Sequence, residues 1–333
     1  MAKKVLVIGA TGAMGRYLVP ELAKGDFIID ALSLDEAKSE FPNVTYYKVN
    51  AKDPAIRADY LAKHYDAIVD FMVYSTAETE AVVPLMTQAT GQYFYVSSCR
   101  VFDDKEVPIR ESSPRLIDSS EDKALLASDD YCIHKARGEN ILRALPTKNW
   151  TIVRPSTTYS YLRYQLVTWE APDCVGRAFA GKAVVLPVQA YAIPASLCWG
   201  CDVGKMIAAL VGNDRALGED FNVTTNESHT WSEIADYYKD ICGLKAIWVD
   251  KEDYLDIRAQ WPGSRQACRW QLEYARLFRR VYDNSKLLDV TGLKQEQFIS
   301  LYDGLKHEID RTPRDYPFPN NQLMDDYLKK LLP

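Results

Sequence analysis

Three glycines after the first apolar run constrain this chain more than any other feature. Val5-Leu6-Val7-Ile8 leads directly into Gly9-Ala10-Thr11-Gly12-Ala13-Met14-Gly15, and a helical pattern follows. Glycines three residues apart at a strand–helix junction allow a tight turn, close approach of the backbone to a pyrophosphate, and close helix packing. Free N–H groups at the start of the helix face the phosphates. The turn therefore predicts a dinucleotide site that includes Gly9, Thr11, Gly12, Ala13, Met14 and Gly15.

The first half of the chain alternates short apolar runs with helical patterns, which is typical of parallel strands joined by crossover helices. The predicted strands are Lys3–Ile8, Phe27–Leu34, Val44–Val49, Ala67–Val73, Gln92–Ser97, Trp150–Arg154 and Phe221–Thr224. The predicted helices include Met14–Lys24, Glu78–Thr90, Ser128–Leu145, Val203–Val211 and Trp231–Ile241. This order predicts an α/β fold with a Rossmann-type, doubly wound parallel sheet.

The regular alternation ends near Tyr159, and the 333 residues suffice for about two domains. We expect an NAD(P)-binding Rossmann domain over residues 1–158 plus about 187–225. We expect a smaller, mostly helical substrate-binding lobe from about 159–186 and 226–333.

Composition and charge exclude several classes of function. Forty basic against forty-six acidic side chains give a net charge of −6, which offers no overall attraction to nucleic acid or anionic lipid. The most apolar stretch, Ala183–Gly200, is broken by two prolines, so no membrane segment is expected. The apolar run after Lys4 is too short for a secretory signal, which predicts a cytoplasmic protein.

The cysteines and histidines predict neither disulfides nor a metal site. Seven cysteines spread along the chain are expected to be reduced thiols, and the Cys198-x-x-Cys201 pair is expected to be a packing feature. The four histidines show no metal-ligand spacing, so no metal is expected.

The end of the second predicted strand bears on the choice of cofactor. An acidic residue there binds the ribose 2′-hydroxyl of NAD, whereas an arginine binds the 2′-phosphate of NADP. Asp35 is the acidic candidate, and no arginine stands beside it. The sequence favours NAD, although Arg16 could serve a 2′-phosphate and Asp35 could simply cap a turn.

Tyr131 and Lys135 are four residues apart and share one face of a predicted helix. A phenol has an ordinary pKa of ~10, and a nearby ammonium together with an oxidised nicotinamide lowers it. Tyr131 could then accept a proton from a substrate hydroxyl, while Lys135 also binds the cofactor ribose. Ser98 follows the fifth predicted strand, at the sheet edge where ligands bind, and could polarise the same oxygen.

With Ser98, Tyr131 and Lys135 following the glycine turn in order, the chain resembles the extended short-chain dehydrogenases. More narrowly, it resembles the NAD-dependent epimerase/dehydratase family, which acts on nucleotide sugars. Stretches that match this family are Val101-Phe102-Asp103, Arg154-Pro155, Asp202-Val203, Asp283-Asn284-Ser285-Lys286 and Gly304-Leu305. The resemblance implies cofactor contacts from Asn50, Asp53, Phe71 and Pro155, a nucleotide-sugar substrate, and a homodimer.

The chain departs from the family pattern beside Ser98. Cys99 and Arg100 occupy the positions where 4,6-dehydratases carry an acidic pair, so dehydration is disfavoured and both become candidate substrate contacts. Phe71-Met72-Val73-Tyr74 replaces the family's alanine pair and would reshape the wall beside the nicotinamide. His134 is expected to point away from Tyr131 as a surface histidine.

Five arginines follow Pro262-Gly263. If this segment is one helix, its arginines fall within one arc of about 100° and could grip a nucleotide diphosphate, or form a solvated face paired with carboxylates. They are Arg265, Arg269, Arg276, Arg279 and Arg280. The expected substrate contacts from arginine beyond Arg100 are Arg163, Arg276 and Arg280.

The sequence leaves three functions open. The first is a nucleotide-sugar 4-epimerase with a Ser-Tyr-Lys site, and the second is a keto-sugar dehydrogenase or reductase that exchanges NAD(P)H. The third is a non-catalytic NAD- or RNA-binding relative, in which the arginine face and its aromatic neighbours bind single strands. The intact Ser-Tyr-Lys set and the net negative charge argue against RNA.

Overall fold

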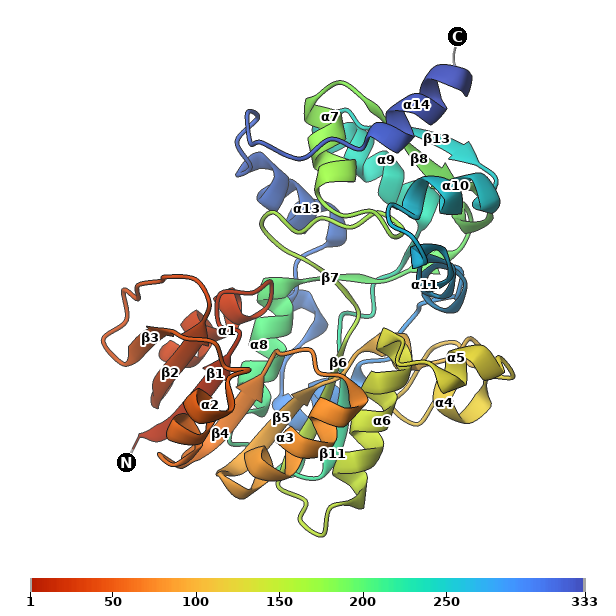
Figure 1. Ribbon diagram of the computed structural model, residues 1–333. Helices are drawn as coiled ribbons and strands as arrows, with labels where there is room; N and C mark the ends of the chain where they lie inside the picture. The colour runs from red at the N-terminus through yellow and green to blue at the C-terminus, as the bar shows by residue number, and fades with distance from the viewer. Residues whose placement is uncertain (1, 332–333) are drawn as a thin grey trace.

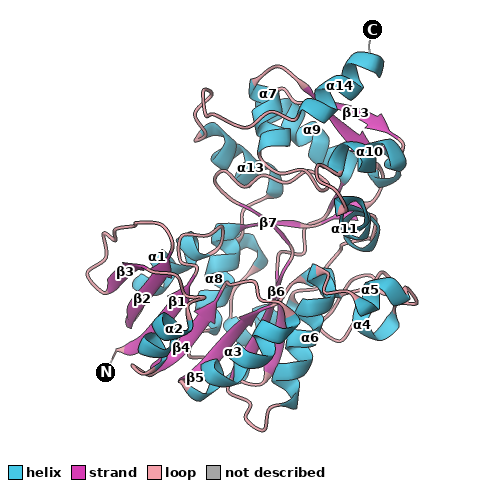
Figure 2. Ribbon diagram, viewed as in Figure 1, coloured by secondary structure: helices cyan, strands magenta, loops and turns pink. Residues whose placement is uncertain are grey.

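Seven parallel strands form one sheet in the order β11-β6-β5-β4-β1-β2-β3, in a computed structural model that describes residues 2–331 (Figures 1 and 2). Their bounds are β1 Lys3–Ile8, β2 Phe27–Ser33, β3 Val44–Lys48, β4 Tyr65–Asp70, β5 Thr90–Val96, β6 Trp150–Pro155 and β11 Glu219–Val223. The predicted doubly wound sheet is confirmed. The strand order reverses beside β1, which pairs with β2 on one side and with β4 on the other. Ligands of such sheets bind at this reversal, beyond the carboxyl ends of the strands.

Alternating side chains of β1 supply both faces of the sheet. Val5 and Val7 pack with α1, α8 and α12, whereas Leu6 and Ile8 pack with α2, α3 and α6 on the other face. The helices are α1 Gly15–Ala23, α2 Pro54–Leu61, α3 Thr76–Gln88, α6 Tyr131–Ala144, α8 Gly200–Leu210 and α12 Ser285–Thr291.

Capping residues explain where the observed helices depart from the predicted bounds. The helix expected over 78–90 is α3, which begins at Thr76 because Ser75 and Glu78 form a capping box. The helix expected from Ser128 is α6, which begins at Tyr131 because the Asp130 side chain accepts a bond from the Cys132 N–H. Helix α2 was not predicted.

A second lobe lies beyond the carboxyl edge of the sheet (Figure 1). Its short strands pair as β7 with β10, β8 with β13, and β9 with β12. The bounds are β7 Thr157–Tyr159, β8 Ala183–Pro187, β9 Pro194–Ala195, β10 Leu197–Trp199, β12 His229–Thr230 and β13 Lys245–Val249. Its helices are α7 Arg177–Phe179, α9 Trp231–Cys242, α10 Lys251–Arg258, α11 Ser264–Gln271, α13 Leu301–Asp310 and α14 Gln322–Leu331. The short helices α4 Leu116–Ser119 and α5 Lys123–Ala127 precede α6 in the sheet domain.

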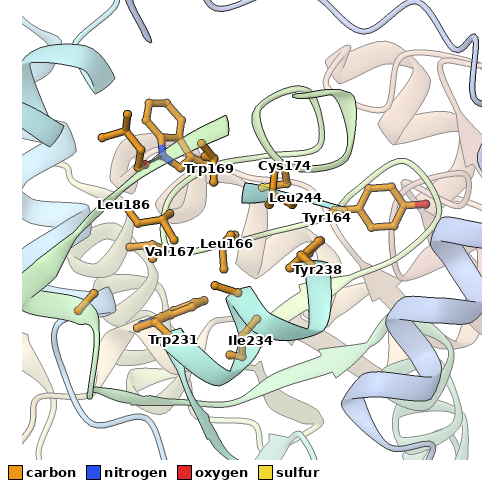
Figure 3. Close-up of a cluster of buried hydrophobic side chains, with 14 of the residues drawn as sticks. Tyr164, Leu166, Val167, Trp169, Cys174, Leu186, Trp231, Ile234, Tyr238 and Leu244 are labelled. Carbon is orange, nitrogen blue, oxygen red and sulfur yellow. Dashed lines mark hydrogen bonds between the residues drawn. The ribbon is translucent and has the colours of Figure 1, made fainter. Parts of the chain in front are cut away.

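The lobe has a hydrophobic core of its own. Side chains from the irregular segment before β8 meet those of α9, with Trp169 and Trp231 both buried (Figure 3). Burial of large aromatic side chains is the main stabilising term available to a lobe with so little sheet. The expected smaller, mostly helical second region is therefore present.

The chain crosses between the two cores more often than the expected boundaries imply. Ala190, Ala195 and Leu197 pack with the lobe, although residues 187–225 were expected in the Rossmann domain. Leu287 and Phe298 pack under the sheet, although 226–333 was expected in the lobe. The division into a cofactor-binding domain and a substrate-binding lobe stays a proposal. The last two residues assigned to that lobe, 332–333, lie outside the residues that the structure describes. Within residues 2–331, no helix has the length and apolar character needed to span a bilayer.

Candidate functional site

The glycine turn forms the floor of a hollow of about 280 Å³ at the reversal in strand order. Gly9 has a φ of +81°, a conformation that glycine adopts without strain. A Cβ on Gly15 would lie 2.8 Å from the Cα of Ala10, so only glycine allows α1 to begin this close to β1. The other walls come from the ends of β2, β3 and β4. Residues lining the hollow include Gly9, Thr11, Gly12, Ala13, Met14, Gly15, Asp35, Asn50 and Phe71. This open glycine cradle fits a dinucleotide.

Asp35 lies on the wall of this hollow and is held by Thr11, whose hydroxyl donates to its carboxylate at 2.8 Å. Arg16 is directed elsewhere, since its guanidinium donates to the Thr11 carbonyl oxygen and lies over the Tyr161 ring. Asp53 does not line the hollow. Its carboxylate caps α2 by accepting the Ala55 N–H at 2.8 Å, so the geometry gives no support to its expected cofactor contact.

A second hollow of about 460 Å³ adjoins the first, and Met14, Phe71 and Arg163 line both. The structure places on its wall the other residues singled out from the sequence: Ser98, Cys99, Arg100, Tyr131, Lys135, Pro155, Arg276 and Arg280. Except for Asp53, every expected contact residue therefore lies on one of two adjoining hollows.

Tyr131 is the first residue of α6, and the cap of that helix fixes its position. The Asp130 carboxylate accepts the Cys132 N–H at 3.1 Å and also the Arg100 guanidinium at 2.9 Å. The guanidinium carbon of Arg100 lies 5.7 Å from the centre of the Tyr131 ring. Arg100 thus joins the end of β5 to the start of α6, beside the phenol.

Burial raises the pKa of Tyr131, an effect that the sequence did not indicate. A hydrogen bond from Ser98 and the charges of Arg100, Arg163 and Arg276 act in the opposite direction, because each favours the phenolate. Guanidiniums therefore stand beside the phenol together with the Lys135 ammonium, whose nitrogen lies 5.8 Å from the centre of the Tyr131 ring.

Lys135 is 2% exposed, and its ammonium donates to the Val96 carbonyl oxygen at 2.8 Å. Burial lowers the pKa of Lys135 to about 8, while the carboxylates of Asp70 and Glu139 act to raise it. Asp70 ends β4, one residue before the Phe71 wall that the two hollows share.

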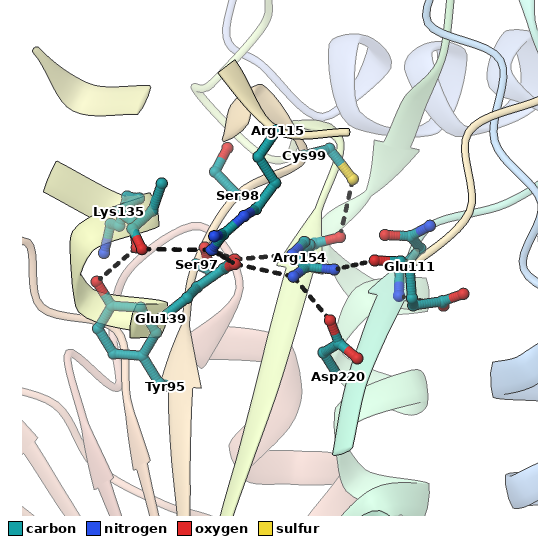
Figure 4. Close-up of polar contacts among 12 residues, drawn as sticks. Tyr95, Ser97, Ser98, Cys99, Glu111, Arg115, Lys135, Glu139, Arg154 and Asp220 are labelled. Atoms are coloured by element: carbon teal, nitrogen blue, oxygen red, sulfur yellow. Dashed lines mark hydrogen bonds and ion pairs between the residues drawn. The ribbon is translucent and has the colours of Figure 1, made fainter. Parts of the chain in front are cut away.

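A buried ion network holds α6 against the sheet one turn beyond Lys135 (Figure 4). The Glu139 carboxylate accepts Arg154 at 2.7 and 2.8 Å, and it also accepts Arg115 at 3.0 Å and the Ser97 hydroxyl at 2.6 Å. Glu139 and Arg154 are both fully buried. Sequence reasoning noted Arg154 as a family match but missed Glu139, because an acidic residue on a helix reads as solvent-exposed without its partner.

The predicted arginine face does not form, because the α-helix ends at Gln271 and a π-helical turn, 272–276, follows. Arg265 and Arg269 pair with carboxylates on α10, including Glu252, and form the solvated face that was the alternative interpretation. Arg279 pairs with Asp104.

Arg276 and Arg280 turn toward the larger hollow. Arg276 donates to the Val167 carbonyl oxygen at 2.7 Å and to the side chains of Thr157 and Gln165. Arg280 donates to four backbone carbonyl oxygens, which leaves little of its guanidinium to grip a phosphate directly.

His134 is 7% exposed and its ring packs edge-on against Tyr131, with ring centres 5.3 Å apart. The expectation of a surface histidine pointing away from Tyr131 is therefore wrong. The first turn of α6 lies against the body of the protein, since Cys132, Ile133 and His134 are all buried. Burial lowers the pKa of His134.

The aperiodic segment after β7 supplies wall residues that sequence reasoning missed, among them Gln165 and Glu170. Val167 has a φ of +54°, which is strained for a β-branched residue, and its carbonyl oxygen accepts Arg276. No sequence signal identifies a left-handed valine. Cys99 and Cys198 are buried, and all seven cysteines are free thiols. No cluster of potential metal ligands occurs among residues 2–331.

Comparison with known proteins identifies the sheet domain and the fold. Residues 9–168 match the NAD(P)H-binding family. No curated protein matches the chain.

Three solved structures illustrate the likeness of fold. An epimerase from Methanothermobacter thermautotrophicus aligns with a TM-score of 0.68 and 14% identity, covering 99% of this chain and 94% of its own. A UDP-glucuronic acid 4-epimerase from Bacillus cereus, in complex with UDP-glucuronic acid and NAD, aligns with a TM-score of 0.67 and 14% identity, covering 92% of this chain and 98% of its own. A dTDP-glucose 4,6-dehydratase from Bacillus anthracis, in complex with NAD, aligns with a TM-score of 0.67 and 17% identity, covering 93% of this chain and 96% of its own. Residues 9–168 therefore form an NAD(P)-binding Rossmann domain, and the chain shares its overall fold with these epimerases and this dehydratase, as the sequence predicted.

Proposed function

We propose that this protein is an NAD-dependent enzyme that acts on a sugar hydroxyl of a nucleotide sugar, and that its reaction is epimerisation at C4. The observation that carries the proposal is the meeting of Ser98, Tyr131 and Lys135 on one wall, beside a glycine cradle that fits a dinucleotide. Phe71 and Met14 border both hollows, so a nicotinamide ring placed there would face the substrate. Structures of the same fold hold NAD and a nucleotide sugar.

The residues on this wall divide the proton chemistry between them. The bound dinucleotide supplies the two-electron acceptor for the carbinol hydrogen. Tyr131, as phenolate, accepts the proton of the sugar hydroxyl and returns it when the ketone is reduced again. Ser98 donates a hydrogen bond to the same oxygen, and Lys135 holds the cofactor ribose. Arg100, Arg163 and Arg276 favour the phenolate that this cycle requires.

The cofactor contacts favour NAD over NADP. Asp35 stands on the cradle wall, where its carboxylate would accept a ribose hydroxyl and repel a 2′-phosphate. Arg16 is occupied by the Thr11 carbonyl oxygen. Asn50, Phe71 and Pro155 complete the proposed contacts with the cofactor.

The wall beside Ser98 favours epimerisation over dehydration. Cys99 is fully buried against the Arg154 carbonyl oxygen, and burial raises the pKa of its thiol to about 12. Arg100 carries a guanidinium group in place of a carboxyl group. Neither can act as the carboxylic acid or the carboxylate that water elimination requires, whereas the Ser98, Tyr131 and Lys135 set supports oxidation and re-reduction at one carbon.

The arginines of the wall are the proposed diphosphate contacts. Arg163 is exposed, borders both hollows, and makes no side-chain hydrogen bond to any residue among 2–331, so its guanidinium is free for a phosphate. Arg276 lies deeper on the same wall. The pairing of Arg265 and Arg269 with α10 removes the continuous arginine surface on which the RNA-binding alternative rested.

A panel assay tests the proposal. Purified protein is incubated with UDP-, dTDP- and GDP-linked sugars without added cofactor, and the C4 epimers are resolved by proton NMR. We expect conversion of at least one sugar, and its loss in Tyr131→Phe. Net formation of NADH with a ketone product would indicate the dehydrogenase instead. No conversion in either direction, with or without added NAD, would contradict the proposal.

A further inference from the structure

Positive charge is in excess on the wall of the larger hollow. Its carboxylates are Asp130 and Glu170. Its basic side chains are Arg100, Lys135, Arg163, Arg258, Arg276 and Arg280.

Most of these guanidiniums are held by neutral acceptors, which orient a cation without cancelling its charge. Arg276 and Arg280 donate to carbonyl, hydroxyl and amide oxygens. Arg258 donates to the Thr168 hydroxyl at 3.2 Å. Burial and the neighbouring charges of Arg100 and Arg280 lower the pKa of Arg276 to about 10, and the carboxylate of Glu170 offsets only part of this effect, as expected where cations outnumber carboxylates.

The diphosphate of a nucleotide sugar accounts for only part of this excess. It brings two negative charges, and a sugar separates it from the carbon that reacts. Arg163 and Arg258 lie on the wall without a carboxylate partner and are suited to those phosphates.

Arg100 lies at the reacting end of the hollow. It comes two residues after Ser98, and its guanidinium carbon lies 5.7 Å from the centre of the Tyr131 ring. One nitrogen, Nη2, donates to Asp130 at 2.9 Å, whereas Nη1 has no partner among residues 2–331. A group bound to Arg100 would therefore belong to the sugar and stand beside the reacting hydroxyl.

We propose that the substrate is a nucleotide-linked uronic acid, whose carboxylate on the carbon next to the reacting carbinol binds Arg100. This inference rests on the function proposed above. Asp130 already offsets part of the Arg100 charge, so a singly charged carboxylate fits this position better than a phosphate dianion. The carboxylate gives the substrate a third negative charge, as the surplus of basic groups requires.

Matched pairs of ligands isolate the carboxylate. UDP-glucuronic acid is compared with UDP-glucose, UDP-galacturonic acid with UDP-galactose, and GDP-mannuronic acid with GDP-mannose. Within each pair only the C6 group differs. Affinities are measured by calorimetry on the full chain saturated with NAD. We expect the acid of at least one pair to bind about tenfold tighter than its neutral partner, as a charge-assisted hydrogen bond provides.

Variants assign that preference to Arg100. In Arg100→Gln the acid is expected to lose about tenfold in affinity, while its neutral partner changes by less than about threefold. Arg100→Lys should restore part of the preference, which separates the lost charge from any disturbance of the α6 cap. Arg265→Gln is the matched control, since that arginine lies outside the hollow on α11 and pairs with Glu252 and Asp256; it should leave both affinities unchanged.

The outcomes separate this inference from the proposed function. If a neutral sugar binds as tightly as its acid and is epimerised by protein that retains Tyr131, the proposed substrate carboxylate is wrong, whereas the proposed epimerase activity remains supported. A preference that survives in Arg100→Gln would overturn the assignment to Arg100. Binding of none of the six ligands to NAD-loaded protein would overturn the inference and remove support from the proposed function as well.

Discussion

At the scale of single residues, the account depends on the surroundings of Tyr131 and Lys135. Their spacing predicted a shared helix face, and both line the larger hollow. The sequence could not show how deeply each is buried, so it gave no sign of the burial that raises the pKa of Tyr131, and it wrongly predicted a surface position for His134. Both properties depend on segments that are distant in the sequence and pack around these side chains in the fold.

Replacing Tyr131 with phenylalanine should abolish turnover and leave the fold intact. The variant lacks the group proposed to exchange a proton with the substrate hydroxyl, a role that is typically worth about 10²–10⁴ in rate. We expect a fall of at least about 10²-fold in kcat, with an unchanged amount of NAD released per chain on denaturation. Turnover within a few-fold of the parent protein would show that another group carries the proton.

The buried ammonium of Lys135 predicts a loss of activity on the alkaline side. Because burial lowers the pKa of Lys135 to about 8, the ammonium is present below that pH and is lost above it. Asp70 acts to raise this pKa, so in Asp70→Asn the alkaline limb of the kcat profile should move to lower pH. A limb that stays in place, or moves upward, would contradict a role for the Lys135 charge.

At the scale of elements, α6 is the helix that positions Tyr131 and Lys135 in the site. Its cap at Asp130 places Tyr131, and the Glu139 network, one turn beyond Lys135, holds the helix against the ends of β5 and β6. The sequence predicted the helix but not this anchoring. The predicted arginine face required the segment from Arg265 to Arg280 to be one helix. In the structure, α11 ends at Gln271, and the chain then turns toward the larger hollow. Periodicity identifies a helix more reliably than it identifies where that helix ends.

Replacing Glu139 with glutamine should destabilise the protein strongly. The variant leaves buried cations without their carboxylate, which typically costs 3–5 kcal/mol, so we expect a loss of about 3 kcal/mol in urea unfolding. Asp310→Asn is the control, because its pair with Lys306 is exposed and should contribute less than about 1 kcal/mol. Equal losses in the two variants would contradict the anchoring role.

The same carboxylate sets an acid limit to stability. Although burial acts to raise it, the charge of Arg154 holds the pKa of Glu139 down at about 2. Because this value lies below the ordinary ~4.3, the contribution is complete above pH ~4.3 and is lost as the pH falls toward 2. Unfolding free energies of the parent chain should therefore fall in this window, and Glu139→Gln should show a smaller dependence on pH.

At the scale of the whole molecule, the site is shared between the sheet domain and the lobe, so their contact matters for binding. Glu308 of α13 is fully buried where the two meet. It accepts the Trp199 indole N–H at 2.7 Å and a hydrogen bond from the Tyr17 hydroxyl of α1. The sequence predicted both regions, but not this junction or the crossings of the chain at Leu197 and Leu287. The expected homodimer stays a prediction.

Replacing Glu308 with leucine should weaken substrate binding more than cofactor binding. The change removes the carboxylate and leaves the part-buried Tyr17 hydroxyl and Trp199 N–H unpaired, at about 1–3 kcal/mol each. We expect a lower Tm and a raised KM, with unchanged NAD content because the glycine cradle lies within the sheet domain. Glu296→Leu, at an exposed position, is the control. A variant with normal KM but lost NAD would contradict this division of labour.

The most direct test of the central claim is the dinucleotide carried by the freshly purified protein. The protein is denatured, and the released cofactor is identified and counted per chain. An epimerase recycles its cofactor, so the account predicts close to one NAD per chain and no NADP. Protein that is empty and binds NADH or NADPH only weakly would indicate a consumed cosubstrate and contradict the epimerase. Protein that binds neither would contradict the enzyme itself.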